Sequence, residues 1–204
     1  MTCSVSGVPV LTCREAAAAM ALVTANVEPS YEVVAFTCGR GGVSRKLFGK
    51  QGQKGKGMKF NSGTFGWDFG ITPLDISPRQ RLDDVVRLTS ELPFGGTDCA
   101  LPMRWALATR TPVDAFVIYT DNESWAGEVH VDQALSDYRQ KLGIPAKLVA
   151  VALSADRVSV ANPNDAGQLD VVGFDAVAPT VISDFIFGGD PLDTGRGPYR
   201  TPAG

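Results

Sequence analysis

Short, continuous apolar segments that alternate with helical patterns constrain this chain more than any other feature. Asp114–Thr120 and Ala146–Leu153 have the length of strands and are apolar almost throughout, with one amphipathic stretch between them. Continuous apolar character over this length is typical of strands that are buried on both faces. Tyr31–Cys38 is similar, and Leu169–Asp175 is a shorter fourth segment. We therefore predict an α/β fold with a doubly wound, mostly parallel sheet and helices on both faces.

Helical patterns flank each of these segments. Thr12 and Glu15 have the spacing of a capping box, and helix-forming residues follow as far as Val27. Ser77 and Pro78 suit the cap and the first position of a second helix. The expected helices cover 12–27, 77–92, 101–110, 129–143 and 178–187. The predicted domain spans residues 1–187, and residues 188–204 are predicted to be a disordered, Pro- and Gly-rich tail.

A glycine-rich segment at residues 39–66 concentrates positive charge. The whole chain has a formal net charge of −3, yet no acidic residue occurs between Glu32 and Asp68. We interpret the segment as a loop or mobile hairpin, which as a flexible arm could neutralise nucleic-acid phosphates. A solvated charged loop with no partner is the alternative. The candidate RNA-binding cations are Arg40, Arg45, Lys46, Lys50, Lys54, Lys56 and Lys59.

Two turns contain oxygen-bearing side chains that a core does not require. Asp121, Asn122 and Glu123 follow directly on a predicted strand, and Thr97 and Asp98 precede a predicted helix. In an open parallel sheet, the ligand crevice lies beyond the carboxyl ends of the strands. Hydroxyl and carboxylate oxygens there suit a hard divalent cation such as Mg²⁺. The alternative is that these residues only cap a helix and form an Asx turn.

Cysteine and histidine usage argues against several classes of site. The four cysteines, Cys3, Cys13, Cys38 and Cys99, are far apart, and His130 is the only histidine. This pattern disfavours a zinc or disulfide framework and indicates buried or neutral thiols in a reducing compartment. His130 is expected to be a surface or capping residue, and no nucleophile–base pair is evident. No segment approaches the roughly 18 apolar residues of a membrane span, and we expect a cytoplasmic protein without a membrane partner.

Four stretches of this sequence resemble one known family. "LPFGGTDCALPMRWA", "FVIYTDNESWAGEVH", "YRQKLGIPAKLVAVAL" and "NPNDAGQLDVVGFD" are together similar to the von Willebrand factor A domain of the Ro autoantigen, or TROVE-module, RNA-binding proteins. The likeness runs from about residue 7 to residue 187, apart from the basic segment. It implies a von Willebrand factor A fold with a metal-ion-dependent adhesion site, in which Thr97 and Asp121 match two of the ligand positions.

The resemblance also implies a function. It indicates a non-enzymatic domain that acts in the binding of small non-coding RNA of the Y type, or in RNA quality control. An upstream ring of helical repeats would hold the RNA, and this domain would close the ring. The metal site would hold Mg²⁺, or another divalent cation, and could offer it to a carboxylate of a protein partner. The basic segment contacts RNA in this interpretation, although it is longer than the corresponding loop of typical relatives.

The beginning of the sequence departs from the family pattern. Relatives have a first strand followed by Asp-x-Ser-x-Ser, whereas Met1 aligns just after that motif. The first central strand and three ligand positions are therefore expected to be missing, and Ser4 and Ser6 have no preceding apolar strand to place them as substitutes. We expect the chain to be the C-terminal part of a longer product. Two alternatives remain open, a metal-dependent phosphohydrolase-like enzyme and a truncated product without independent activity.

Overall fold

The computed structural model describes residues 1–39, 60–61, 68–92, 97–121, 129–154, 160–174 and 177–188, with the backbone alone in 37–39, 60–61 and 68–70. In chain order the elements are β1 (Ser4–Val5), β2 (Val8–Thr12), α1 (Cys13–Val27), β3 (Val33–Gly39), β4 (Phe60–Asn61), β5 (Asp68–Leu74), α3 (Leu82–Ser90), α4 (Leu101–Thr109), β6 (Ala115–Thr120), α5 (Val131–Leu142), β7 (Lys147–Ala152), β8 (Gln168–Val172) and α6 (Ala178–Phe187).

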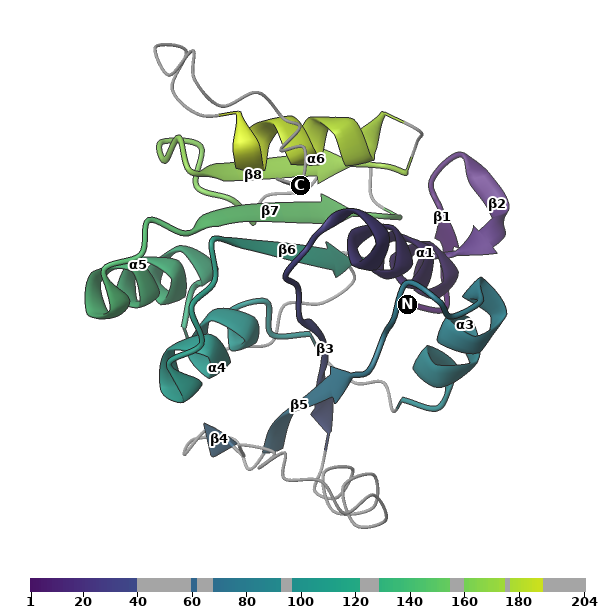
Figure 1. The fold of residues 1–204 in the computed structure, drawn as a ribbon, viewed down its shortest axis with the longest axis horizontal. Helices are drawn as coiled ribbons and strands as arrows, with labels where there is room; N and C mark the ends of the chain where they lie inside the picture. Colours follow the sequence, from purple (N-terminus) through teal and green to yellow (C-terminus); the bar gives the residue numbers. More distant parts are fainter. Residues whose placement is uncertain are drawn as a thin grey trace, which may run out of the picture.

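The strands β6, β7 and β8 form a parallel sheet in that order. Helices α4 and α5 cover one face, and α1 and α6 cover the other (Figure 1). Phe116, Ile118 and Leu148 pack into the core under α4 and α5. Val149 and Val151 pack into the core under α1 and α6. Because side chains alternate across a strand, both faces become apolar, which confirms the predicted α/β architecture.

A second, antiparallel sheet has the order β3–β5–β4. Val33–Gly39 pairs with Asp68–Leu74 along its whole length, so the predicted strand at Tyr31–Cys38 exists but its observed partner is antiparallel. We did not predict β5, because Gly70 and Pro73 weaken its strand pattern. The loop predicted at 39–66 is interrupted by β4, and most of its remainder lies outside the described residues.

In the described part of the chain, β3 and β6 do not pair with each other. Each is the edge strand of its own sheet, with β5 and β7 as the respective partners, and Figure 1 shows β3 and β5 set apart from β6. Even so, Phe36 of β3 packs against the core that contains Phe116 and Ile118 of β6. In the described residues the two sheets therefore share a core, although no strand of one pairs with a strand of the other.

Helix ends follow local sequence signals in α1 and α5 but not in α3. The Thr12 hydroxyl accepts the Glu15 N–H at 3.2 Å and the Glu15 carboxylate accepts the Thr12 N–H at 2.8 Å, which confirms the capping box. The prediction of a helix start at Ser77 was wrong, because α3 begins at Leu82. The Gln80 side chain accepts the Ser77 N–H at 2.8 Å and holds a turn there instead.

No helix within the described ranges is long and apolar enough to cross a membrane.

A hairpin of β1 and β2 precedes α1 and was not predicted. Gly7 has a φ of 78° in its turn, a conformation that glycine adopts without strain. The Ser6 N–H donates to the Leu153 carbonyl oxygen at 3.0 Å, and Val5 is buried. The hairpin is therefore attached to the residue that follows β7, and it brings the amino terminus to the carboxyl end of the parallel sheet.

Candidate functional site

Asp121 lies directly after β6 at the carboxyl end of the parallel sheet. Thr120 and Asp121 are only 5% and 6% exposed. The Leu153 N–H donates to the Thr120 carbonyl oxygen at 2.9 Å, and the Ser154 hydroxyl donates to the Asp121 carbonyl oxygen. The end of β7 therefore holds the residues after β6 in place. Asn122 and Glu123, also predicted at this rim, lie outside the described residues.

The turn before α4 contains the other predicted oxygens. Thr97 is half-buried, and Asp98 is 1% exposed. Asp98 Oδ1 accepts the Ala100 N–H at 2.9 Å, and Arg104 Nη1 lies 3.9 Å from Asp98 Oδ2. Asp98 thus forms an Asx turn, whereas the alternative interpretation for this stretch was a helix cap, and the N-cap residue of α4, Ala100, has no side-chain cap hydrogen bond. Its side chain stabilises the start of α4 rather than pointing a free carboxylate at a ligand.

Cys99 connects the two turns electrostatically. Burial is the largest cause that raises the pKa of its thiol to about 11, followed by the negative charges of Asp98 and Asp121. Both carboxylates therefore act on the same buried thiol. The fold brings the Thr97–Cys99 turn and the end of β6 into one neighbourhood, as expected for two loops at the same edge of a sheet.

Other thiols and the amino terminus surround Asp121. The Met1 ammonium group forms an ion pair with Asp121 Oδ2. The Cys3 Sγ atom lies 3.9 Å from the same oxygen and 3.5 Å from Cys13 Sγ. Burial, and then the Cys3 thiol, raise the pKa of Cys13 to about 12. Sequence reasoning treated these cysteines as unrelated, and their spacing contains no signal that would have brought them together.

The described residues do not by themselves complete a divalent-metal site. Among them, no group of three or more His, Cys, Asp or Glu side chains is placed to hold a metal ion. Thr97 and Asp121 supply two oxygen-bearing side chains. Ser4 donates its hydroxyl proton to the Pro9 carbonyl oxygen. Because Mg²⁺ requires near-ideal octahedral oxygen ligation, Thr97 and Asp121 stay predicted ligands that need further donors.

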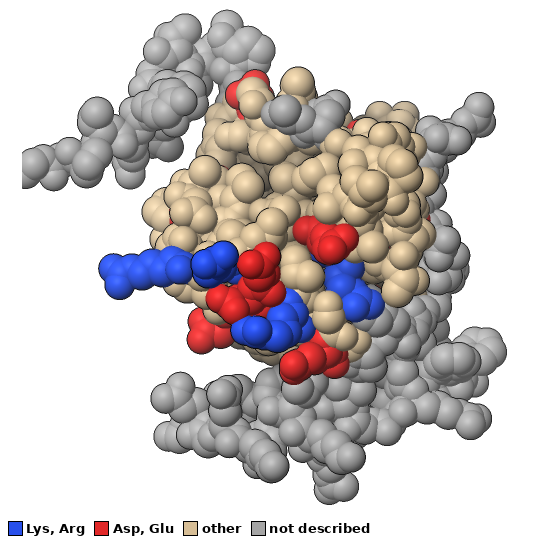
Figure 2. Space-filling model, turned by 90° about the vertical axis from the view of Figure 1, so that its right-hand side faces the viewer, with Lys and Arg blue, Asp and Glu red and all other residues tan. Residues whose placement is uncertain are grey.

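Charged side chains on the described surface are of mixed sign. Figure 2 shows Lys and Arg side chains next to Asp and Glu side chains on one face, with uncharged residues over much of the rest. Exposed Arg81 lies 3.6 Å from Asp83, and Arg87 lies 2.5 Å from Asp84. The seven candidate RNA-binding cations, at positions 40 to 59, lie outside the described residues.

His130 is the N-cap residue of α5. Its Nδ1 atom accepts the Asp132 N–H at 3.3 Å, which confirms the predicted capping role. Gly143 ends the same helix in the left-handed conformation, with a φ of 70°. The imidazole is therefore part of a helix start, where Nδ1 already has a hydrogen-bond donor.

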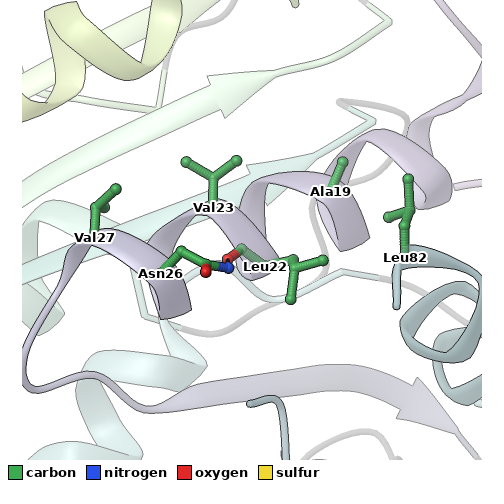
Figure 3. Close-up of a pocket in the computed structure, with 6 residues that line it drawn as sticks. All are labelled: Ala19, Leu22, Val23, Asn26, Val27 and Leu82. Carbon is green, nitrogen blue, oxygen red and sulfur yellow. Dashed lines mark hydrogen bonds between the residues drawn. The ribbon is translucent and has the colours of Figure 1, made fainter. Parts of the chain in front are cut away.

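An apolar hollow of about 440 Å³ lies on α1, and Asp121 is not among its lining residues. Figure 3 shows Ala19, Val23 and Val27 along α1, with Leu82 of α3 beside them. Leu22 and Asn26 complete its lining, so none of the lining side chains is an acid, a base or a nucleophile. The hollow is therefore not a candidate for chemistry.

Comparison with known proteins identifies the family. A family model described as the Ro60 vWA domain matches residues 1–186. This chain belongs to the Ro60 vWA domain family. It is 42% identical over 189 residues to "RNA-binding protein RO60" of Deinococcus radiodurans, and 35% identical over 189 residues to "RNA-binding protein RO60" of Caenorhabditis elegans. Each alignment covers 92% of this chain, but only 30% and 24% of the respective relative.

A solved structure supports the same assignment. The crystal structure of the Deinococcus radiodurans RO (RSR) protein matches with a TM-score of 0.71 and 41% identity, over 92% of this chain and 32% of that chain. The predicted resemblance is confirmed, and so is the fold class. The chain spans about a third or less of the length of the relatives that it matches.

Proposed function

We propose that this chain is the vWA portion of a non-enzymatic RNA-binding protein. The observation that carries the proposal is the match of the Ro60 vWA model to residues 1–186, together with relatives whose names describe RNA-binding proteins. The described site is compatible with this role. Asp98 is engaged in a turn and His130 in a helix cap, so neither is presented as a general base.

The basic segment is the proposed RNA contact of this chain. Gly39 and Asn61 pair with Asp68 from opposite sides of β5, so the segment between them starts and ends at the same level of the antiparallel sheet. Its seven cations, without a single acid among them, would neutralise phosphates independently of base sequence. The RNA class that we propose is a small, structured non-coding RNA of the Y type.

A further segment is proposed to complete the parallel sheet. β3 and β6 each have a single strand partner in the described residues, yet they share a core through Phe36. Unpaired backbone groups at such edges favour the addition of a strand. We propose that an apolar strand from an upstream segment, linked to the helical-repeat ring, lies between β3 and β6. Its end would bring the ligands that Thr97 and Asp121 lack for Mg²⁺, and a partner's carboxylate could then bind the metal.

RNA binding is tested by fluorescence anisotropy with a labelled RNA hairpin that has a single-stranded end. We expect binding that weakens with salt, with a slope of log K against log salt of about −0.7 for each neutralised phosphate. Replacement of Lys50, Lys54 and Lys56 by Gln should therefore reduce the slope by about 2. A matched control replaces three exposed cations of the described surface, Arg81, Arg87 and Lys141, which are 82%, 72% and 57% exposed.

The outcomes separate the competing interpretations. Equal losses in the two triple variants would show that binding is non-specific charge attraction and not a property of the basic segment. Absence of binding at low salt would refute RNA contact by this chain. Release of phosphate from a generic aryl phosphate in the presence of Mg²⁺, abolished by Asp121→Ala, would instead favour the phosphohydrolase-like alternative.

A further inference from the structure

Two thiols face each other beside Asp121. The Sγ atoms of Cys3 and Cys13 are 3.5 Å apart. The backbone holds them opposite each other, because the Cys13 N–H donates to the Cys3 carbonyl oxygen at 2.9 Å. The adjacent residues, Ser4 and Thr12, are partners in the antiparallel register of β1 and β2. Cys3 is half-buried, whereas Cys13 is fully buried.

We propose that Cys3 and Cys13 are a redox modification site that closes to a reversible disulfide. Opposed residues of an antiparallel pair have Cα atoms about 4.5–5.5 Å apart, and disulfides span about 4.4–6.8 Å between Cα atoms. The adjacent opposed pair, Ser4 and Thr12, is therefore close to the separation that a disulfide needs, and Cys3 and Cys13 lie one position beyond it. To form the bond, the sulfur atoms must approach to about 2.05 Å, which rotation about the Cα–Cβ bonds of the two residues supplies. The proposal does not depend on RNA or metal binding.

The oxidant is a hydroperoxide, with hydrogen peroxide as the simplest case. Cys3 is the more accessible thiol, so its sulfur attacks a peroxide oxygen, the O–O bond breaks, and Cys3 sulfenic acid and water result. The Cys13 sulfur then attacks the sulfenic sulfur. The S–S bond forms, the S–O bond breaks, and the departing hydroxide takes the Cys13 proton and leaves as a second water. Two thiols are thereby oxidised and one peroxide is reduced to two waters.

The surroundings of the two sulfur atoms assign the order of these steps. Burial, and then the neighbouring Cys3 thiol, raise the pKa of Cys13 to about 12, so Cys13 is protonated at neutral pH. A buried, protonated thiol reacts slowly with oxidants in solution. Cys13 is nevertheless suited to the second step. There the sulfenic sulfur of Cys3 is held in contact with it, and this proximity makes the reaction fast even when little of the Cys13 thiol is ionised.

Oxidation would change the surroundings of Asp121. In the reduced protein, the Cys3 thiol lies 3.9 Å from Asp121 Oδ2, where it can donate a weak hydrogen bond. A disulfide has no S–H group, so the carboxylate would lose that donor. The new bond would also join the hairpin of β1 and β2 to the first residue of α1. The modification thus falls within the candidate metal site.

The test oxidises the purified chain with one equivalent of hydrogen peroxide at neutral pH. Remaining thiols are then blocked with iodoacetamide, and the peptides are mapped by mass spectrometry without reduction. We expect a dominant peptide pair that links Cys3 to Cys13, lighter by two hydrogen atoms and separated by dithiothreitol. A variant with Cys38→Ser and Cys99→Ser should give the same link, and Cys3→Ser should abolish it.

The same reaction in guanidinium chloride is the reference. In the folded chain the Cys3–Cys13 link should exceed links of Cys3 to Cys38 or Cys99 by about tenfold more than in the denatured chain, because the fold holds the Cys13 sulfur against the sulfur that is oxidised first. The same distribution of links in the two conditions, or links to Cys38 or Cys99 that form as readily in the folded chain, would overturn the proposal.

Discussion

The hydroxyl of Tyr138 in α5 ties this helix to the segment that leads into β6. Tyr138 is fully buried, and its ring meets Phe116 edge-on with centroids 5.0 Å apart. The hydroxyl accepts the Val113 N–H at 2.7 Å and donates to the Thr111 carbonyl oxygen at 2.8 Å. Since β6 continues to Asp121, these two hydrogen bonds help to position the candidate site.

Replacement of Tyr138 by Phe should cost about 2 kcal/mol of unfolding free energy. The ring and its packing remain, but one N–H and one carbonyl lose their partner. Each unmade hydrogen bond costs about 1–3 kcal/mol when it is buried. Thr111 and Val113 are only half-buried, so water can partly compensate and the lower end of the range applies. For a chain of this size, such a loss lowers Tm by about 4–8 °C.

The assay is urea unfolding followed by tryptophan fluorescence, with an unchanged m-value as the criterion for an intact fold. Tyr31→Phe is the matched control, because the half-buried Tyr31 donates a single hydrogen bond, to the Ile76 carbonyl oxygen at 2.9 Å. It should cost about 1 kcal/mol or less. If Tyr138→Phe lowers the unfolding free energy no more than the control does, the two hydrogen bonds of the Tyr138 hydroxyl do not stabilise the segment before β6 and the reasoning is wrong.

Four further predictions concern other parts of the structure. Lys147→Met should lower the unfolding free energy by about 1–2 kcal/mol in urea titrations. The reason is that the Lys147 ammonium donates to the last carbonyl oxygens of α6 at 2.7 and 3.0 Å. An unfolding free energy unchanged within error would contradict this role. Burial alone would raise the pKa of Asp165, but hydrogen bonds, including one from Arg139, hold this pKa below its ordinary value of 3.8. The stabilisation of the folded state by the ionised Asp165 carboxylate is therefore lost as pH falls below about 4. The stability difference between wild type and Arg139→Met should accordingly shrink in acid, and a constant difference would refute the linkage. The pKa of Cys99 is raised from 9.0 to about 11, so the unfolding free energy of the wild type falls as pH rises through this window. Between pH 9 and pH 11, Cys99→Ala should therefore lose about 2 kcal/mol less unfolding free energy than the wild type. Addition of 10 mM Mg²⁺ should stabilise the chain by less than about 0.5 kcal/mol, since two side-chain donors bind weakly; saturable stabilisation that disappears in Asp121→Ala would show that the site needs no further ligands.

Local signals in the sequence were enough wherever neighbouring residues decide the structure. The capping box of Thr12 and Glu15 formed as predicted, and Gly143 ends α5. The continuous apolar pattern of β7 correctly indicated a strand buried on both faces, whereas in β6 buried residues alternate with half-buried ones. Helix α3 is the informative failure, because Ser77 and Pro78 had the right identities for a helix start. The Gln80 side chain nevertheless accepts the Ser77 N–H and stabilises a turn at that position.

Contacts between distant residues were outside the reach of these patterns. Strand β5 contains Gly70 and Pro73, and it exists as a strand because β3 and β4 pair with it on both sides. The arrangement of Cys3, Cys13 and the end of β6 is likewise tertiary, because a hairpin docked on Leu153 places the first residues of the chain beside a strand more than a hundred positions away.

The sequence by itself determined the α/β class, the family and two residues at the rim of the sheet. Apolar periodicity, helix caps and sequence motifs are properties of neighbouring residues, so the sequence shows them directly. Only the tertiary structure decided that β3 and β6 do not pair with each other in the described residues, and that two thiols meet beside Asp121. These features depend on which surfaces pack together. Packing is a property of the whole folded chain, because it is governed by the burial of apolar area and by hydrogen bonds between segments that are distant in sequence.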